Sequence, residues 1–207
     1  DLNFTIDEGT ISKINKIYFI GNESFDKNTL LGQMKSKQRN FIRFFSNINF
    51  KKFQIKNDVI RLKNYYKNNG FKDVEVEYKT EFISQKNKFN VYFYINEGKK
   101  YNFIDFAINS EEINLSETQS QDVQNIVSDF YDKKIKKKNN YNQSYLDEIK
   151  EKIAEYLYQE GLIFFKIEVF EKINNSDVAI LLKLNLDNPK YVNQINIYGN
   201  TRTNEKV

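Results

Sequence analysis

Hydrophobic and polar residues alternate along several short stretches, which predicts strands at 14–20, 74–78 and 89–95. Apolar residues at helical spacing between the first two strands predict an amphipathic helix from Ile55, Val59, Leu62 and Tyr66. A shorter helix is expected at 28–34. The first half of the chain is therefore predicted to run strand, helix, helix, strand, strand.

The second half repeats this order. The same alternation predicts strands at 101–109, 164–170 and 178–186. Two intervening helices are predicted from apolar stripes, at Val123, Ile126, Val127 and Phe130 and at Leu146, Ile149, Ile153 and Leu157. Ser144 is expected to open the second of these helices as a variant of the capping box.

Matching positions in the two halves are separated by a nearly constant number of residues. The turn positions Gly9, Gly98 and Asn188 are 89 and 90 residues apart. The helix end at 65–70 matches that at 156–161 with an offset of 91. This spacing indicates an internal repeat of one β-α-α-β-β unit.

The repeat predicts an α+β fold of tandem units, each a three-stranded mixed sheet covered on one face by two helices. If the helical connection is a right-handed crossover, the first and third strands run parallel. The third strand is then central and the second is an edge. We expect the tail of a preceding unit at 1–10, complete units at 11–98 and 99–188, and the first strand of a following, truncated unit at 189–207.

Turns are expected where glycine or asparagine follows a strand or a helix. These positions are Gly21, Asn22, Gly70, Gly98, Gly161, Gly199 and Asn200. Both ends of the chain read as cut from a longer protein.

The composition excludes most catalytic chemistry. The 207 residues include no His and no Cys, so no Ser-His-Asp triad, His-ligated metal, thiolate nucleophile or disulfide can form. A lysine base or a carboxylate pair remains open in principle, but pairs such as Glu111 and Glu112 lie in a polar stretch. The net charge of +4 is too small to imply a nucleic-acid or membrane partner. We therefore expect no enzyme activity, no cofactor and no metal site.

Three motifs accompany the repeated unit: the Glu97-Gly98 turn before a strand, the Gly21-Asn22 strand end, and the Tyr-Tyr-x-x-x-Gly helix end at 65–70. Together with the β-α-α-β-β order, they resemble POTRA domains, the periplasmic modules of proteins that assemble β-barrels in the outer membrane. The run at 191–203 resembles the opening of the last POTRA domain before the barrel, and the insertion at 43–53 resembles the third domain. The chain would then hold POTRA domains three and four, with the tail of two and the start of five.

One departure from the family pattern lies at 107–110, where Ala-Ile-Asn-Ser replaces the Gly-Asn strand end and leaves the first turn geometry of the second unit open. The resemblance implies a non-catalytic arm on the periplasmic face of a Gram-negative outer membrane. Such an arm receives unfolded outer-membrane proteins, docks accessory lipoproteins and feeds a C-terminal barrel that this sequence lacks.

Two other functions remain open. Related two-partner secretion and translocation-assembly transporters also carry POTRA domains. A nucleic-acid-binding module, from a different class, would need lysines and aromatic residues on one open sheet face, and nucleic acid is not the expected partner.

The second strand of each unit is the predicted partner-binding edge, because an edge strand offers unpaired N–H and C=O groups to an incoming strand. The residues assigned to this role are Val74, Glu75, Val76, Glu77, Tyr78, Phe164, Lys166 and Ile167. In the first unit, the apolar residues Val74, Val76, Tyr78 and Phe82 are expected to face the helices. The charged residues between them, Glu75, Glu77, Lys79 and Glu81, are expected to face solvent. The alternative is that these charges only prevent edge-to-edge aggregation.

A basic and aromatic loop is the second candidate binding segment, formed by Arg39, Phe41, Arg43, Phe44 and Phe45. It could contact a protein, a lipid surface or nucleic acid. The alternative is a loop whose phenylalanines pack on its own domain. The lysine cluster at 133–138 is expected to be a solvated loop between helices.

Overall fold

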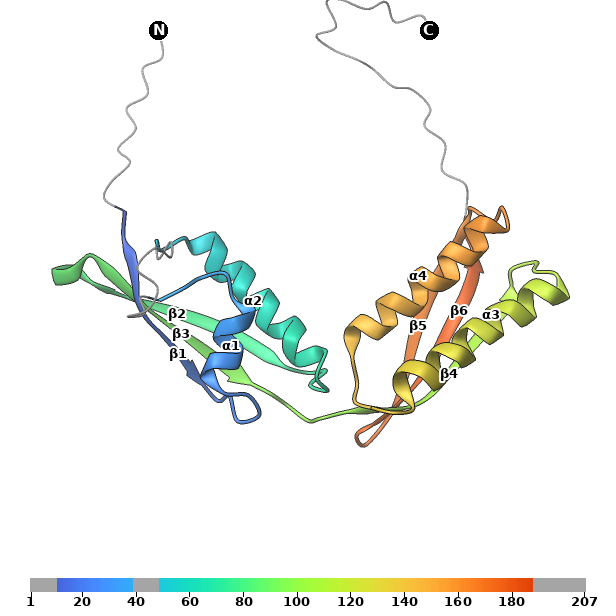
Figure 1. The fold of residues 1–207 in the computed structure, drawn as a ribbon, viewed down its shortest axis with the longest axis horizontal. Helices are drawn as coiled ribbons and strands as arrows, with labels where there is room; N and C mark the ends of the chain where they lie inside the picture. The colour runs from blue at the N-terminus through green and yellow to red at the C-terminus, as the bar shows by residue number, and fades with distance from the viewer. Residues whose placement is uncertain (1–10, 39–48, 188–207) are drawn as a thin grey trace, which may run out of the picture.

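The structure is a computed structural model that describes residues 11–38 and 49–187. Figure 1 shows two separate α+β units joined by an extended segment between them. The first unit contains β1 (Lys13–Ile20), α1 (Lys27–Gln33), α2 (Lys52–Lys67), β2 (Glu75–Ile83) and β3 (Lys88–Asn96). The second contains β4 (Asn102–Glu112), α3 (Glu117–Phe130), α4 (Gln143–Gln159), β5 (Phe165–Asn174) and β6 (Asp177–Leu186).

The two sheets have the same topology. In the first, β3 lies in the centre, parallel to β1 and antiparallel to β2. In the second, β6 is central, parallel to β4 and antiparallel to β5. The two helices of each unit pack on one face of its sheet, so the predicted tandem β-α-α-β-β fold is confirmed. The predicted ends at 1–10 and 189–207 lie outside the described residues, and the boundaries between units remain a prediction.

Each unit has its own hydrophobic core, built from the helical stripes and the inward-facing strand residues. In the first, the fully buried residues include Ile17, Ile55, Leu62, Tyr66 and Phe93. In the second, they include Phe103, Val123, Ile149, Ile153 and Leu182. The sequence periodicity therefore placed the helices on the correct face, because apolar residues at helical spacing must leave water together.

Polar side chains cap three of the helices. Asp26 accepts hydrogen bonds from the N–H groups of Asn28 and Thr29, and these bonds lower the pKa of its carboxyl. α3 begins with a reciprocal capping box between Ser116 and Gln119. The expected cap at Ser144 is wrong, because α4 begins at Gln143 and Asn142 caps it. The Ser144 N–H and hydroxyl instead donate to the Asn142 side chain.

Two elements extend further than the sequence pattern indicated. β2 runs five residues beyond Tyr78 because it pairs with β3 along its whole length, as far as Ile83. β4 continues through 107–110 to Glu112, so this departure from the Gly-Asn pattern lies inside a strand. The prediction of a loop at 133–138 is wrong for its first part. α3 continues into a π-helical turn at Tyr131–Ile135, so the first lysines of the cluster are helical.

Polar contacts hold the junction between the units. The Tyr101 N–H donates to the Gly70 carbonyl over 2.8 Å, and its hydroxyl donates to the Asp73 carboxylate over 2.6 Å. The Ser144 N–H also donates to the Asn68 side chain over 3.1 Å. The segment that follows α2 is therefore attached to the second unit at several points.

Within the described ranges, no helix is long and apolar enough to cross a membrane.

Candidate functional site

The two sheets together have four outer edges, and segments of the same chain cover two of them. Along β1, the Ile17 N–H donates to the Gln38 side chain over 2.8 Å. The Phe50 N–H donates to the Ser12 carbonyl over 2.9 Å, beside a short β-bridge between Lys13 and Asn49. These contacts occupy backbone groups that an incoming strand would need.

β4 is covered in the same way. The Phe103 N–H donates to the Asn139 carbonyl over 2.6 Å, and the Tyr141 N–H donates to the Tyr101 carbonyl over 2.9 Å. The Tyr131 hydroxyl donates a hydrogen bond to the Ile104 carbonyl over 3.0 Å. At the beginning of β4, these backbone groups are therefore already hydrogen-bonded and cannot pair with a partner strand.

β2 and β5 differ from these strands, because in the part of the chain that the structure describes their backbone groups bond only to the central strands β3 and β6. The residues assigned to binding lie along these edges, except that Val74 and Phe164 directly precede the two strands. Val74 is buried in the first core and Phe164 is 42% exposed. Whether a partner docks at either edge remains a prediction.

A groove runs between β2 and α2. It has a volume of about 420 Å³. It is lined by Lys56, Val59, Val76, Glu77 and Tyr78. A strand added to β2 would turn every second side chain into this groove. Sequence reasoning assigned Val59 to the core and did not single out Lys56, because only the tertiary contact of α2 with β2 brings them to the edge.

On the outward face of β2, two charged side chains contact neighbouring residues and two do not. Lys79 lies over the Tyr94 ring, 5.5 Å from its centroid. Glu81 accepts hydrogen bonds from Asn90 and Tyr92, which lower the pKa of its carboxyl. The remaining two carboxylates of this face, Glu75 and Glu77, are exposed. Among residues 11–38 and 49–187 they have no hydrogen-bond or ion-pair partner.

The outward face of β5 is different. Lys166 and Glu168 pair with each other over 2.5 Å, which lowers the pKa of the Glu168 carboxyl and raises that of the Lys166 ammonium. Next along this face is Phe170, which is 49% exposed opposite Leu181. Ile167 lies on the other face and packs against the second core.

The predicted turns within the described ranges lie at element ends. Gly21, Gly70, Gly98 and Gly161 all have positive φ, which was expected from the sequence at the helix ends Gly70 and Gly161. Asn22 donates to the Phe25 carbonyl over 2.9 Å. Gly199 and Asn200 lie outside the described residues, as does the whole basic aromatic loop with Arg39, Phe41, Arg43, Phe44 and Phe45.

The open face of the first sheet carries aromatic residues and lysines, the combination that a nucleic-acid-binding module would need. Tyr18 and Tyr92 stack on each other with ring centroids 4.9 Å apart, and Lys27 lies over the Tyr18 ring. Lys79 covers Tyr94 in the same manner. These rings already have partners, so base stacking would have to displace them.

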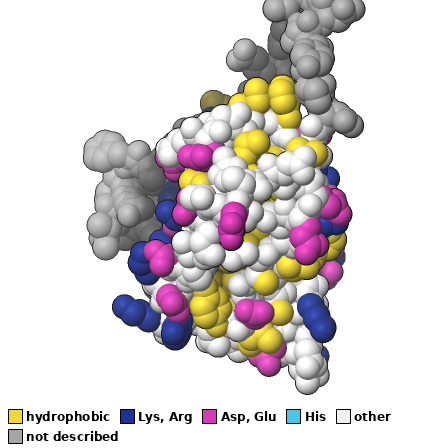
Figure 2. Space-filling model, turned by 90° about the vertical axis from the view of Figure 1, so that its right-hand side faces the viewer, with side chains coloured by type: hydrophobic (Ala, Val, Ile, Leu, Met, Phe, Trp, Pro, Cys, Tyr) yellow, Lys and Arg dark blue, Asp and Glu magenta, His cyan; other side chains and the backbone are white. Residues whose placement is uncertain are grey.

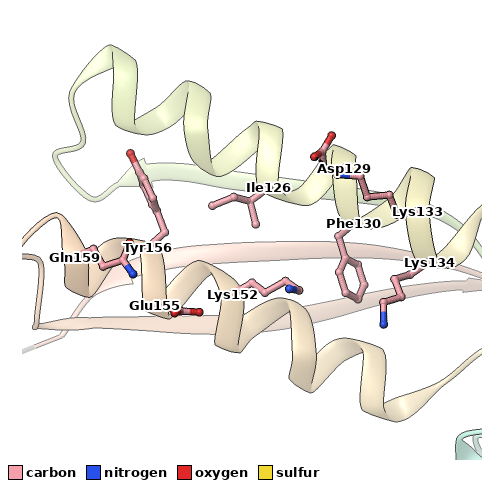
Figure 3. Close-up of a pocket in the computed structure, with 9 residues that line it drawn as sticks. All are labelled: Ile126, Asp129, Phe130, Lys133, Lys134, Lys152, Glu155, Tyr156 and Gln159. Atoms are coloured by element: carbon pink, nitrogen blue, oxygen red, sulfur yellow. Dashed lines mark hydrogen bonds and ion pairs between the residues drawn. The ribbon is translucent and has the colours of Figure 1, made fainter.

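A second groove, of about 450 Å³, lies between α3 and α4 (Figure 3). Phe130 and Ile126 point into it from α3, and Tyr156 and Lys152 approach from α4. Lys133 and Asp129 on its rim form an ion pair over 2.6 Å. Figure 2, which views the second unit from the side, shows small hydrophobic patches separated by acidic side chains.

In the described parts of the chain, no group of three or more acidic side chains is placed to hold a metal ion.

The comparisons with known proteins agree with this architecture. Residues 12–98 match the family model "POTRA: Surface antigen variable number repeat". The whole chain is 29% identical to the outer membrane protein assembly factor BamA of Buchnera aphidicola and covers 32% of it. It is 23% identical to BamA of Neisseria meningitidis and covers 25% of that protein. The chain thus spans a third or less of these relatives.

Solved structures show the same fold. The crystal structure of Haemophilus influenzae BamA POTRA3-5 superposes with a TM-score of 0.68 at 19% identity, covering 88% of this chain and 69% of that one. BamA from Haemophilus ducreyi lacking POTRA domains 1-3 gives a TM-score of 0.55 at 13% identity, covering 85% of this chain and 30% of that one. Residues 12–98 therefore match the POTRA family model, the second unit repeats the same topology, and the chain as a whole is similar to tandem POTRA domains of BamA.

Proposed function

We propose that the chain is a scaffold segment of the machinery that assembles β-barrel proteins in the outer membrane. In this role it holds extended segments of unfolded outer-membrane proteins, and of accessory lipoproteins, by strand addition to β2 and β5. POTRA domains of BamA lie in the periplasm, at the outer membrane of Gram-negative bacteria, and the chain works there. The match to POTRA3-5 supports its numbering as domains three and four.

The observation that carries this proposal is the contrast between edges. The chain covers part of β1 and the beginning of β4 with its own segments, while along β2 and β5 no such contact occurs within residues 11–38 and 49–187. An uncovered strand edge is an aggregation hazard, so its presence in both repeats favours a use for it. The groove beside β2 supplies space for the inward side chains of a partner.

The expected affinity is low. A five-residue strand forms about five hydrogen bonds, each contributing about 0.5–1.5 kcal/mol net. Ordering the peptide costs about 1–2 kcal/mol per residue, which nearly cancels this gain. Backbone pairing alone therefore supplies little net affinity. With apolar side chains of the client packed in the groove beside β2, we expect dissociation constants between about 1 mM and tens of micromolar, which suits transient binding of many different clients.

An NMR titration of the isotope-labelled 207-residue chain tests the proposal. An extended amphipathic peptide should shift the amide signals of β2 and β5 and leave those of β1 and β4 unchanged. The control is the same peptide with alternate backbone nitrogens methylated, which keeps its side chains but cannot complete the ladder. The proposal fails if β2 and β5 do not respond at millimolar peptide, or if the methylated peptide binds equally well.

A further inference from the structure

The two open edges present different charges to an incoming strand. On the outward face of β2, the exposed carboxylates of Glu75 and Glu77 lie two residues apart, without a hydrogen-bond or ion-pair partner in the described part of the chain. The other two charged residues of this face are already engaged. Lys79 lies over Tyr94, and Glu81 is held by Asn90 and Tyr92. The unsatisfied charge on the outward face of this edge is therefore negative, whereas the groove on its other face is lined by Lys56.

β5 has the opposite character. Its only outward carboxylate, Glu168, is paired with Lys166 and also accepts a hydrogen bond from Asn185 over 2.8 Å. Two residues beyond the exposed Phe170 on the same face is Lys172, which is exposed and has no ion-pair partner within the described ranges. The unsatisfied charge of this edge is positive.

We propose that β2 selects extended segments with Lys or Arg at two alternate outward positions and apolar residues between them, and that β5 does not. This inference rests on the proposed function, strand docking at the open edges. The apolar residues of such a segment would enter the groove over Val59 and Tyr78. Its basic residues would lie opposite Glu75 and Glu77.

The geometry supports this selection for either direction of the incoming strand. Side chains directly opposite each other on neighbouring strands have Cβ atoms about 4.5–5.5 Å apart, within reach of a charge pair. Opposite charges at such positions are favourable and like charges are unfavourable. An acidic segment on β2 would bring further carboxylates beside two that already have the same sign.

Two peptides of equal length provide the test, one with Lys and the other with Glu at two alternate positions of a Val- and Ile-containing strand. Both are titrated into the labelled 207-residue chain, and the amides of β2 and β5 report each edge separately in one sample. At β2, the Lys peptide should bind about tenfold more tightly than the Glu peptide. At β5 this preference should vanish or reverse. The preference at β2 should also weaken as salt is added.

The double substitution Glu75→Lys and Glu77→Lys should reverse the preference at β2 and leave β5 unchanged. A matched control is Glu23→Lys with Glu151→Lys, which changes the net charge equally at exposed positions outside β2 and β5. Equal binding of both peptides at β2 would overturn the charge selection while leaving strand docking intact. Absence of any response at β2 and β5 would overturn strand docking and the selection together. A reversal in the control variant would show that only net charge matters.

Discussion

Lys72 of the first unit and Glu171 of the second form an ion pair across the junction, with Nζ 2.9 Å from Oε2. The Glu171 carboxylate also accepts a hydrogen bond from the buried Tyr141 hydroxyl over 3.0 Å. One carboxylate therefore connects the end of the first unit to the core of the second. The two hydrophobic cores remain separate, so polar contacts set the relative placement of the units.

Replacing Glu171 with Ala should loosen this placement without unfolding either unit. The substitution removes the ion pair and one of the two acceptors of the Tyr141 hydroxyl, the other being the Gln143 side chain, and we expect a stability loss of about 1–2 kcal/mol. Residual dipolar couplings should then report different or averaged alignment for the two units. Lys133→Ala is the control, since its ion pair with Asp129 lies within one helical segment. Unchanged relative alignment in the Glu171 variant would contradict this prediction.

Three glycines should respond differently to alanine. Gly21 has φ +85°, and a Cβ there would meet the Ile95 carbonyl oxygen well inside van der Waals distance. We expect Gly21→Ala to destabilise the chain by more than about 2 kcal/mol. Gly161 also has positive φ but open space around it, so its substitution should cost about 1–2 kcal/mol. Gly32→Ala, inside α1, should stabilise by about 0.5–1 kcal/mol. Urea unfolding measures the stability change of each variant. Any other order of the three changes would contradict this reading of the space and φ at each glycine.

Asp58 should be a major contributor to the stability of the first unit. Its fully buried carboxylate accepts hydrogen bonds from the N–H groups of Lys35 and Ser36, over 2.8 and 2.9 Å, and from Arg61 over 2.8 Å. Asp58→Ala would leave these donors without their acceptor, which should cost about 3 kcal/mol in unfolding experiments. Arg61→Ala leaves both backbone bonds in place and should cost about 1 kcal/mol. If both variants lost the same unfolding free energy, the backbone hydrogen bonds of Asp58 would not be its main contribution to stability.

Stability should fall at alkaline pH, in part through Tyr156. Burial and a hydrogen bond to Asp122 raise the pKa of its hydroxyl to about 12, from 10.0. The folded state thus keeps Tyr156 neutral where the unfolded state ionises it. Its contribution is present below pH 10 and is lost as the pH rises from 10 toward about 12. Tyr156→Phe should reduce the slope of unfolding free energy against pH in this window. Tyr158→Phe, which removes an exposed hydroxyl from the same helix, is the matched control.

The repeat, the topology and most core residues could be predicted from the sequence, because each depends on periodicity along one element. Leu146, Ile149, Ile153 and Leu157 were predicted from spacing alone, and all four are buried. The end of β2 could not be predicted, since Lys79, Thr80 and Glu81 are exposed and show no apolar alternation. Pairing with β3, rather than burial, extends the strand.

Contacts between distant segments were beyond the sequence pattern. Asp58 reads as a single acid in a basic stretch, and nothing nearby shows that it holds the N–H groups that follow α1. The covering of β1 by Gln38, and of β4 by Asn139, likewise depends on where loops return to the sheet. The sequence could therefore predict which strands form edges, but not which of these edges remain open.

If strands dock at β2 and β5 as proposed, the chain would offer two weak sites at a separation that the contacts of the junction restrict. A client with two extended segments joined by a flexible linker could occupy both. The second contact would then be intramolecular, with a high effective concentration set by the linker, and the overall avidity would exceed that of either edge. A client that has folded its segments into a closed sheet would lose both contacts together, so its release would be as cooperative as its capture.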